Sequence, residues 1–320
     1  MNNVDKQYLD LLADILANGV EKDTRSGKVK SVFGRQLRFD LKEGFPLLTT
    51  KKVFYRGVIE ELLWFLSGDT NIYPLIKKDI HIWDDDAFRY YKTLFKDGSI
   101  KTKENFLKSV FNKDYFTAHH LKSNITDSEY SMLYRAGDLG PIYGYQWRKY
   151  GNDRLFPIDQ IGNIIKTLKE NPNDRRMLCV AFNPSDIDKM ALPPCHVMFQ
   201  FYTRQLSDGK LGLSCMWVQR SVDVPCGLPF NIASYAALTY MIAEVVGMVP
   251  DELIGSLGDT HIYLNQMDGV KEQLSRKGFD TLPTLSFNRK VDNIDNFKYE
   301  DFNLSNYQSD GVIKYPLNVG

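Results

Sequence analysis

The sequence has no excess of charge of either sign. Its 320 residues include 40 Lys and Arg and 40 Asp and Glu, so the formal net charge at pH 7 is zero. This balance argues against bulk nucleic-acid binding, which needs a basic excess, but it allows a local basic pocket for one phosphate. Proline and glycine are also few, at 13 and 22 residues, which argues against a long disordered or collagen-like region.

Long hydrophobic runs and metal-binding cysteine motifs are absent as well. No apolar stretch approaches the roughly 20 residues of a membrane span, and the first ten residues do not resemble a signal peptide. No two of the four cysteines are spaced as C-x-x-C, which excludes a zinc ribbon or a thioredoxin-type motif. Few cysteines in a chain of this size predict reduced thiols and a cytoplasmic protein with no membrane partner.

The pattern of apolar residues predicts a mixed α and β fold. Hydrophobic residues make up 43% of the chain, enough for a large core. Helical spacing predicts helices at 6–19, 54–66, 158–170 and 229–246. Strands are predicted at 32–41, 177–182, 197–202, 211–219 and 284–288. The stretch at about 87–136 is polar and has little periodicity, so we expect one domain that carries a surface insertion of short helices there.

Two histidines lie side by side in this expected insertion. His119 and His120 are neighbours in the sequence and would point to different faces of a helix or strand. We therefore do not expect the two side chains to share a metal ion, and the simpler interpretation is that both are exposed to solvent.

Two short motifs carry the side chains of a nucleophile and an anion site. Cys195 follows two prolines, which restrict its backbone, and His196 comes next; a thiolate at neutral pH needs positive charge nearby. The alternative is a buried core thiol. Gln219, Arg220 and Ser221 end a predicted strand, where guanidinium and hydroxyl donors suit a phosphate. The alternative there is a surface arginine paired with a neighbouring aspartate.

Further basic and acidic candidates stand at other predicted elements. Arg175 and Arg176 precede an apolar strand, where burial would need an anionic partner, and a solvated turn is the alternative. Arg25 is a weaker candidate of the same kind. Glu61 lies on an apolar helix. Burial there would raise the pKa of its carboxyl group toward neutral pH, which would suit a role in proton transfer. It could instead face solvent, as Glu60 could.

Polar side chains near the C-terminal half suit a nucleoside. Asn231 begins a helix and could cap it, or present its amide to a pyrimidine edge. His261 and Tyr263 alternate, so on a strand they share one face and could both reach a sugar hydroxyl. A buried, hydrogen-bonded histidine is the simpler alternative.

The blocks together form an ordered series. In chain order they are ELLWFLSGDTN at 61–71, IWD at 82–84, GDLGPIYG at 137–144, DRR at 174–176, PCH at 194–196, QRS at 219–221, PFNIASY at 229–235 and GDTHIY at 258–263. This series closely resembles thymidylate synthases, from the N-terminal helix to the last few residues. The resemblance implies an α+β homodimer built on a large, twisted, mostly antiparallel sheet, with the two sheets packed back to back. Some members carry an insertion where this chain does.

The resemblance assigns a nucleotide site for dUMP. Cys195 would add to C6 of the pyrimidine, and Asn231 would bind the uracil edge and stabilise the developing charge. The remaining nucleotide-site residues would be Arg25, Arg220 and Ser221 for the 5′-phosphate, Gln219 as a further dUMP-binding residue, Arg175 and Arg176 donated by the other subunit, and His261 and Tyr263 for the 3′-hydroxyl. Glu61 and Tyr143 would handle protons through water, with His196 assisting.

The resemblance also implies a folate site and no metal. The cosubstrate would be 5,10-methylenetetrahydrofolate, which gives both the carbon and the hydride. The folate-site residues would be Lys51, Ile82, Trp83, Asp86, Asp223, Gly227 and Phe230. Asp223 would also belong to the catalytic set, and no nucleic-acid or membrane partner is expected. If a phage encodes the protein, its location would be the host cytoplasm.

Three departures from the family lie on the folate side. Asp86 replaces a usual tryptophan, Cys226 replaces a usual leucine, and the ending YPLNVG is longer and more polar than usual. A closed tail keeps water from the reactive C5 methylene. Two outcomes therefore stay open, reductive methylation to dTMP or hydroxymethylation of dUMP, and Asn231 argues for dUMP over dCMP. A non-catalytic nucleotide- or RNA-binding relative is a third possibility, which the zero net charge and the intact Cys195 count against.

Overall fold

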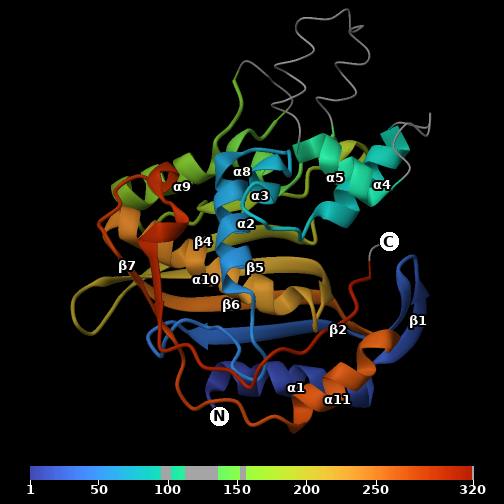
Figure 1. Ribbon diagram of the computed structural model, residues 1–320. Helices are drawn as coiled ribbons and strands as arrows, with labels where there is room; N and C mark the ends of the chain where they lie inside the picture. Colours follow the sequence, from blue (N-terminus) through green and yellow to red (C-terminus); the bar gives the residue numbers. More distant parts are fainter. Residues whose placement is uncertain (95–101, 112–135, 152–155, 319–320) are drawn as a thin grey trace, which may run out of the picture. The chain divides into compact units, whose positions relative to one another are not determined.

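The computed structural model describes residues 1–94, 102–111, 136–151 and 156–318, and it divides into two compact units (Figure 1). The first unit consists of Met1–Leu63, Asp159–Ala181 and Cys195–Gly320. The second consists of Trp64–Ile158 and Phe182–Pro194. Each unit is described by itself below.

A six-stranded sheet forms the centre of the first unit. Its order is β1-β2-β6-β5-β4-β3, with bounds Val20–Thr24 (β1), Gly27–Asp40 (β2), Leu178–Val180 (β3), His196–Gln205 (β4), Leu211–Asp223 (β5) and Val249–Tyr263 (β6). Neighbouring strands are antiparallel except β5 and β6, which are parallel and joined by helix α10 (Gly227–Val246). The observed sheet and helices confirm the expected α+β fold.

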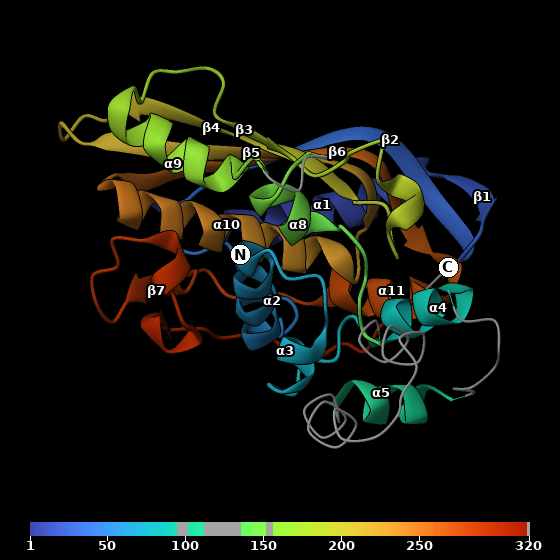
Figure 2. The ribbon, with the colours of Figure 1, turned by 90° about the horizontal axis from the view of Figure 1, so that it is seen from above.

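Helix α10 covers one face of this sheet, as Figure 2 shows. The helix is apolar on almost every side, as its sequence predicts, because it is buried along most of its length. Tyr235 of α10 stacks on Trp217 of β5 with 5.6 Å between ring centroids and 7° between planes. Gly255 of β6 makes this packing possible, since a Cβ there would lie 2.4 Å from the Trp217 ring.

The N-terminal helix α1 (Asn3–Asn18) packs on β2. Asn2 caps its start by accepting from the Asp5 amide, and the predicted stop at Gly19 is confirmed by the Gly19 N–H, which donates to Ile15 O at 2.9 Å. Helix α2 (Tyr55–Ser67) and helix α9 (Gln160–Glu170) also match the predicted spans within a few residues. Helix α11 (Met267–Ser275) was not predicted.

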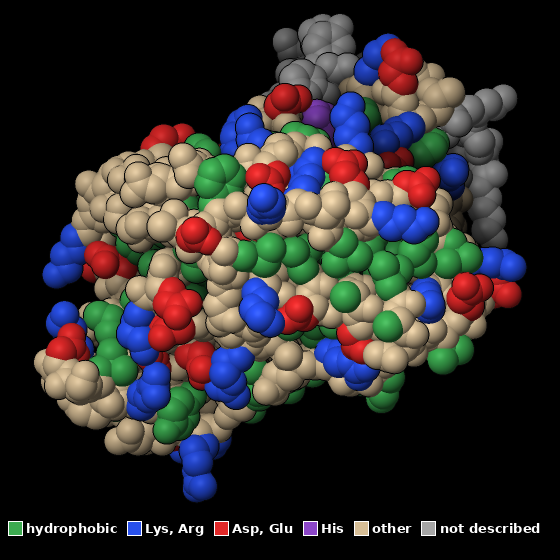
Figure 3. Space-filling view, turned by 90° about the horizontal axis from the view of Figure 1, so that it is seen from below, with side chains coloured by type: hydrophobic (Ala, Val, Ile, Leu, Met, Phe, Trp, Pro, Cys, Tyr) green, Lys and Arg blue, Asp and Glu red, His purple; other side chains and the backbone are tan. Residues whose placement is uncertain are grey.

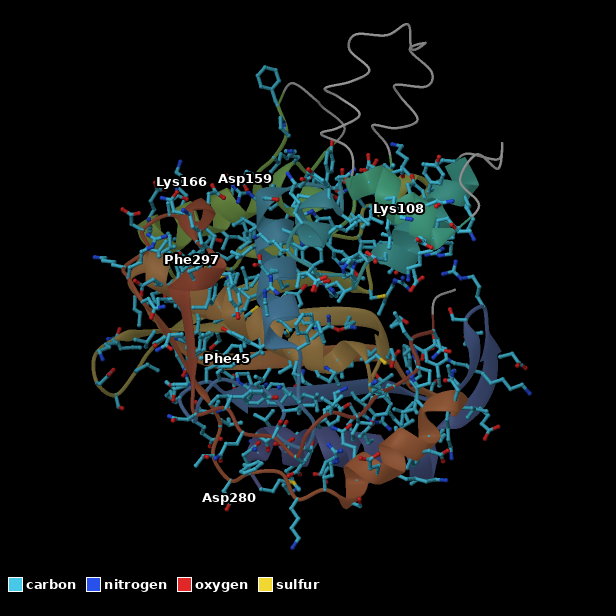
Figure 4. The ribbon with its side chains drawn as sticks, viewed as in Figure 1. Phe45, Lys108, Asp159, Lys166, Asp280 and Phe297 are labelled. Atoms are coloured by element: carbon cyan, nitrogen blue, oxygen red, sulfur yellow. The ribbon has the colours of Figure 1, made fainter. Side chains whose placement is uncertain are left out.

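A second, two-stranded sheet pairs β7 (Thr284–Phe287) with β8 (Phe302–Ser305). The predicted strand at 284–288 is therefore confirmed, but it lies apart from the large sheet. Phe297, labelled in Figure 4, packs beside it, with its ring centroid 5.0 Å from Phe287 and 5.7 Å from Phe302.

The second unit is mainly helical. The α-helices that lie wholly within its described residues are α3 (Tyr73–Ile76), α4 (Asp84–Leu94), α5 (Lys103–Phe111) and α8 (Tyr143–Arg148). The predicted insertion at about 87–136 begins within α4 and includes α5, which confirms short helices for its described parts. His119 and His120 lie outside the described residues. The expectation of one domain with one insertion stays a prediction.

Charges of both signs are interspersed on the face drawn in Figure 3, without a large patch of one sign. This distribution agrees with the zero net charge. Over the described ranges, no helix is both long and apolar enough to cross a membrane.

Candidate active site

Cys195 and Arg220 are brought together by pairing of strands β4 and β5. The Arg220 amide donates to Cys195 O at 2.8 Å, and His196 lies opposite Gln219 in the ladder. Cys195 is partly exposed, whereas Cys179 and Cys215 are buried in the core. Burial raises the pKa of the Cys215 thiol to about 12, so it is inert at neutral pH. Of these three cysteines, only Cys195 is accessible and beside an arginine.

His196, the residue that follows the candidate nucleophile, is buried. Its Nδ1 lies 2.8 Å from the hydroxyl of Tyr235, and its side chain is 8% exposed. Burial lowers the pKa of His196 to about 3, which keeps the imidazole neutral at physiological pH. A neutral, hydrogen-bonded ring is better suited to holding Cys195 in place than to donating protons.

Asn231 is oriented by a chain of buried hydrogen bonds. Trp217 Nε1 donates to Gln219 Oε1 at 3.1 Å, and Gln219 Nε2 donates to Asn231 Oδ1 at 3.0 Å. Gln219 is 3% exposed, so both its polar atoms need these partners. Because Oδ1 accepts from Gln219, the Nδ2 donor of Asn231 is oriented for an acceptor such as a uracil oxygen.

His261 and Tyr263 share one face of β6, as the alternation predicts. Their rings meet edge to face with centroids 5.3 Å apart. His261 Nδ1 lies 3.2 Å from Asp259, and the Asp259 carboxylate also pairs with Lys22. Both rings are largely buried, at 7% and 9% exposed. Arg25 is exposed at the turn between β1 and β2, and its neighbour Ser26 hydrogen bonds to Tyr263.

Arg175 and Arg176 are both exposed just before β3. Arg176 binds Asp174 through two bonds, Nε to Oδ1 at 3.0 Å and Nη2 to Oδ2 at 2.6 Å. This fork holds the pKa of Asp174 at about 2. The solvated-turn alternative therefore describes these arginines within the single chain.

Helix α2 carries two neighbouring glutamates, and their exposure differs. Glu61 is half-buried, which suits a proton-transfer group that can still contact substrate or water. Glu60, which the sequence allows to face solvent, is buried at 4% exposed. Apolar residues surround both along the helix, so composition alone could not separate them.

A polar cluster surrounds Asp223 at the end of β5. Asp223 accepts from the Cys226 amide at 3.2 Å and from Gln266 Nε2 at 3.3 Å. Burial raises the pKa of the Asp223 carboxyl above its ordinary value. Lys51 donates to Pro225 O beside this cluster, and burial lowers the pKa of Lys51 to about 8. Gln266 was missed in the sequence, because no local pattern marks it.

Gly227, Phe230 and Ser221 lie close to this region in the chain. Gly227 and Phe230 lie in the first turn of α10, and both are half-buried. Gly227 is one helical turn before Asn231, and Phe230 directly precedes it. Ser221 is half-buried at the end of β5, and its carbonyl accepts from Gln219 at 3.1 Å.

The second unit holds the remaining predicted residues in an aromatic cluster. Trp83 lies 6.2 Å from Tyr143 between ring centroids, and Phe65 lies 5.0 Å from Tyr143. Trp83 and Tyr143 are buried, at 7% and 2% exposed, and Ile82 is half-buried.

Asp86 in the same unit is held by an ion pair with Arg89. Arg89 Nη2 donates to Asp86 Oδ1 at 2.6 Å and to Ala191 O at 3.1 Å. The carboxylate that replaces the family's tryptophan therefore has a cationic partner one helical turn away. Within the described ranges no group of three or more His, Cys, Asp or Glu side chains is placed to hold a metal ion.

Comparison with known proteins agrees with this arrangement. The sequence matches the thymidylate synthase family over residues 6–319. It is 44% identical over 323 residues to a thymidylate synthase of Listeria innocua, covering 98% of this chain and 100% of the relative. Thymidylate synthases of two strains of Listeria monocytogenes serotype 4b are equally similar over the same share of each chain.

These matches bear on the two reactions left open by the sequence. Relatives matched from end to end have the name of the methylating enzyme, so the hydroxymethylase alternative is not favoured. The expected reaction is methyl transfer from 5,10-methylenetetrahydrofolate to dUMP. The chain belongs to the thymidylate synthase family.

Proposed function

We propose that Cys195 is the nucleophile that adds to C6 of dUMP. Its partial exposure and the backbone pairing of the neighbouring Arg220 support this role, and in this proposal the Arg220 guanidinium supplies the positive charge that favours the thiolate. Addition to C6 turns C5 into an enolate-like carbon nucleophile, and negative charge develops on O4. Asn231, oriented by Gln219, donates to that oxygen and lowers the barrier.

The nucleotide phosphate is held by Arg220, Ser221 and Arg25 in this proposal. Arg220 is exposed and directly beside Cys195, so a bound phosphate would keep the base within reach of the thiol. His261 and Tyr263 bind the 3′-hydroxyl of the sugar. Their burial and mutual contact support a rigid sugar subsite.

Proton transfer is assigned to Glu61 and Tyr143, as the family resemblance implies. His196 takes a positioning role, because its buried imidazole is neutral. The residues assigned to 5,10-methylenetetrahydrofolate, which supplies the carbon and the hydride, are those that the family resemblance implies. The set is Lys51, Ile82, Trp83, Asp86, Asp223, Gly227 and Phe230.

We also propose that the protein acts as a homodimer through the face of the large sheet opposite α10. This face is half-exposed and carries Met198, Met216, Val218 and Ile254 on adjacent strands in register. A continuous apolar surface of this kind is typical of a protein interface. Arg175 and Arg176 stand beside β3 at the end of the same sheet, which supports their donation to the partner's phosphate site. A cytoplasmic location stays a prediction.

Subunit mixing tests the donated arginines. Cys195→Ala and the double variant Arg175→Ala/Arg176→Ala should each be inactive as homodimers. After mixing and exchange, one site of each mixed dimer has an intact cysteine and intact arginines, so up to about a quarter of the wild-type activity should return. If the mixture stays inactive while size-exclusion and mass measurements show mixed dimers, the arginines act within their own chain.

The observation that carries the proposal is the joining of Cys195 to Arg220 beside the oriented Asn231. Product analysis tests it. The enzyme is incubated with dUMP and 5,10-methylenetetrahydrofolate, the nucleotides are resolved by mass, and dihydrofolate is followed by absorbance. A nucleotide heavier by CH₂ with dihydrofolate is expected. A nucleotide heavier by CH₂O with tetrahydrofolate would mean that water replaces the hydride, and no product would contradict the proposal.

A further inference from the structure

The C-terminal tail of this chain is held by side-chain hydrogen bonds. The Tyr315 hydroxyl lies 2.7 Å from Gln273 Oε1 and 2.9 Å from Gly269 O, both on α11, and donates its proton to one of them. Pro316 O accepts from Gln266 Nε2 at 3.1 Å. The side-chain amides of Asn318 and Asn265 form two hydrogen bonds: Asn265 Nδ2 donates to Asn318 Oδ1 at 3.0 Å, and Asn318 Nδ2 donates to Asn265 Oδ1 at 3.2 Å. The tail is therefore docked along α11 and the segment before it.

The tyrosine contact continues into the core of the first unit. Gln273 is fully buried, and its Nε2 donates to Thr50 Oγ1 at 3.1 Å. The Thr50 hydroxyl in turn donates to Asp5 Oδ1 at 2.8 Å. Asp5 is also fully buried and accepts from both the amide and hydroxyl of Thr49. An unbroken hydrogen-bonded path thus joins the tail to α1.

This path passes the backbone of a predicted folate-site residue. Lys51 follows Thr50 directly, and its ammonium lies 4.7 Å from the centre of the Tyr315 ring. The Lys52 amide donates to Gly311 O at 2.8 Å, which ties the same segment to the start of the tail. One tyrosine therefore contacts both the buried network, through its hydroxyl, and Lys51, through its ring.

We propose that Tyr315 is a positioning residue that docks the tail before any cosubstrate binds. An alanine at this place would offer neither a hydroxyl for Gln273 nor a ring for Lys51. The docked tail would lower the conformational cost of closing the folate side, so the cosubstrate would bind more tightly than with a loose tail. This effect on the cosubstrate rests on the proposed function, whereas the docking itself does not.

Limited trypsin digestion measures the docking directly. Cleavage after the exposed Lys314 releases the peptide of residues 315–320, which mass spectrometry can quantify without any enzyme assay. A protease needs an undocked, extended segment, so the release rate reports the undocked population. Tyr315→Phe removes only the hydroxyl and should speed the release roughly 2- to 10-fold, the range for one hydrogen bond. Tyr315→Ala also loses the ring contact and should be faster still.

Tyr55→Phe is the matched control. The Tyr55 hydroxyl is buried and, among the described residues, has no hydrogen-bond partner, so its loss should leave the release rate unchanged. Equal rates for the wild type, Tyr315→Phe and Tyr315→Ala would overturn the proposal.

Steady-state kinetics separate this proposal from the proposed function. Tyr315→Phe should raise KM for 5,10-methylenetetrahydrofolate several-fold and leave KM for dUMP unchanged. A wild type without turnover but with tyrosine-dependent protection of the tail would refute the function and keep the docking. A wild type that produces dTMP, with the same release rate in all variants, would refute the docking alone.

Discussion

The nucleotide side and the folate side of the proposed site are built in different ways. On the nucleotide side, Cys195 and Arg220 are joined by backbone pairing of two central strands, and Asn231 is oriented by the buried Gln219. The family motifs there are intact. On the folate side, three departures from the family fall within or beside helices and the tail, at Asp86, Cys226 and the ending YPLNVG.

Each departure has its own partner in this chain. Asp86 pairs with Arg89, the Cys226 thiol lies 3.7 Å from Pro316 O, and Asn318 pairs with Asn265. Polar replacements near a binding site are tolerated when hydrogen bonds or opposite charges satisfy them. Backbone pairing within the sheet therefore positions the proposed nucleotide-site groups, whereas pairs of side chains satisfy the altered residues on the folate side.

The largest effect is expected at the nucleophile. Cys195→Ala removes the attacking sulfur but leaves Arg220, Ser221 and Asn231, so turnover should fall by at least ~10³-fold, about 4 kcal/mol, while dUMP still binds. Radiolabel or absorbance assays measure turnover, and calorimetry measures dUMP binding. Normal turnover in this variant would contradict the covalent mechanism.

Gln219→Met tests the orientation of Asn231. It leaves Trp217 Nε1 and Asn231 Oδ1 without partners in a buried site, so kcat/KM for dUMP should fall about 100-fold, near 3 kcal/mol. Gln205→Met, at an exposed position near the far end of the neighbouring strand, is the control. A similar loss in both variants would point to general damage of the sheet.

The pH dependence of stability should depend on His196. Its pKa is about 3 in the folded chain and near 6.5 when unfolded. Between these values the unfolded chain binds more protons, so this stability is present above about pH 6.5 and is lost as pH falls. The free energy of unfolding should drop by ~1.4 kcal/mol per pH unit, or about 2 kcal/mol from pH 6.5 to 5.

Denaturant titrations at several pH values measure this slope. His196→Asn lacks the titrating ring and should have a flatter profile over the same interval. The raised pKa of His81 acts in the opposite direction but is common to both proteins. Identical slopes in the wild type and the variant would show that His196 is not buried as a neutral ring.

The smallest effect is expected on the folate side. A double-mutant cycle of Asp86→Ala and Arg89→Ala should give a coupling free energy of about 0.5–1 kcal/mol, because the pair is only partly exposed. Thermal or denaturant unfolding of the four proteins measures it. A coupling near zero would mean that the aspartate is tolerated without its arginine.

Much of the fold could be predicted from the sequence, because strong periodicity marks elements that are buried on one or all sides. Helix α10 is an example, since its apolar run allows no other environment than a core. Strand β6 was not predicted, although the alternation of His261 and Tyr263 allows a strand at its end, because glycines and polar residues interrupt its pattern. Strand β1 is exposed along its whole length, so no hydrophobic pattern marks it.

The site was predictable in its residue types but not in its connections. Motifs indicated Cys195, Arg220 and Asn231, since these side chains suit nucleophilic attack and phosphate or pyrimidine binding wherever they occur. Gln266 and Gln273 could not be found in this way, because each contacts residues far away in the sequence. The sequence left the burial of Glu60 open for the same reason, since it depends on distant packing.

The sequence by itself determined the α+β class, the family resemblance and the chemical inventory of the site, because these depend on local pattern and residue type. The tertiary structure decided the protonation state of buried groups and which side chains hydrogen bond to each other. Burial keeps His196 neutral and lowers the pKa of Lys51 to about 8. Strand register places Arg220 against Cys195, and packing of α11 joins the tail to Asp5 through Gln273. Desolvation and long-range hydrogen bonds exist only once the chain has folded, so no local pattern can encode them alone.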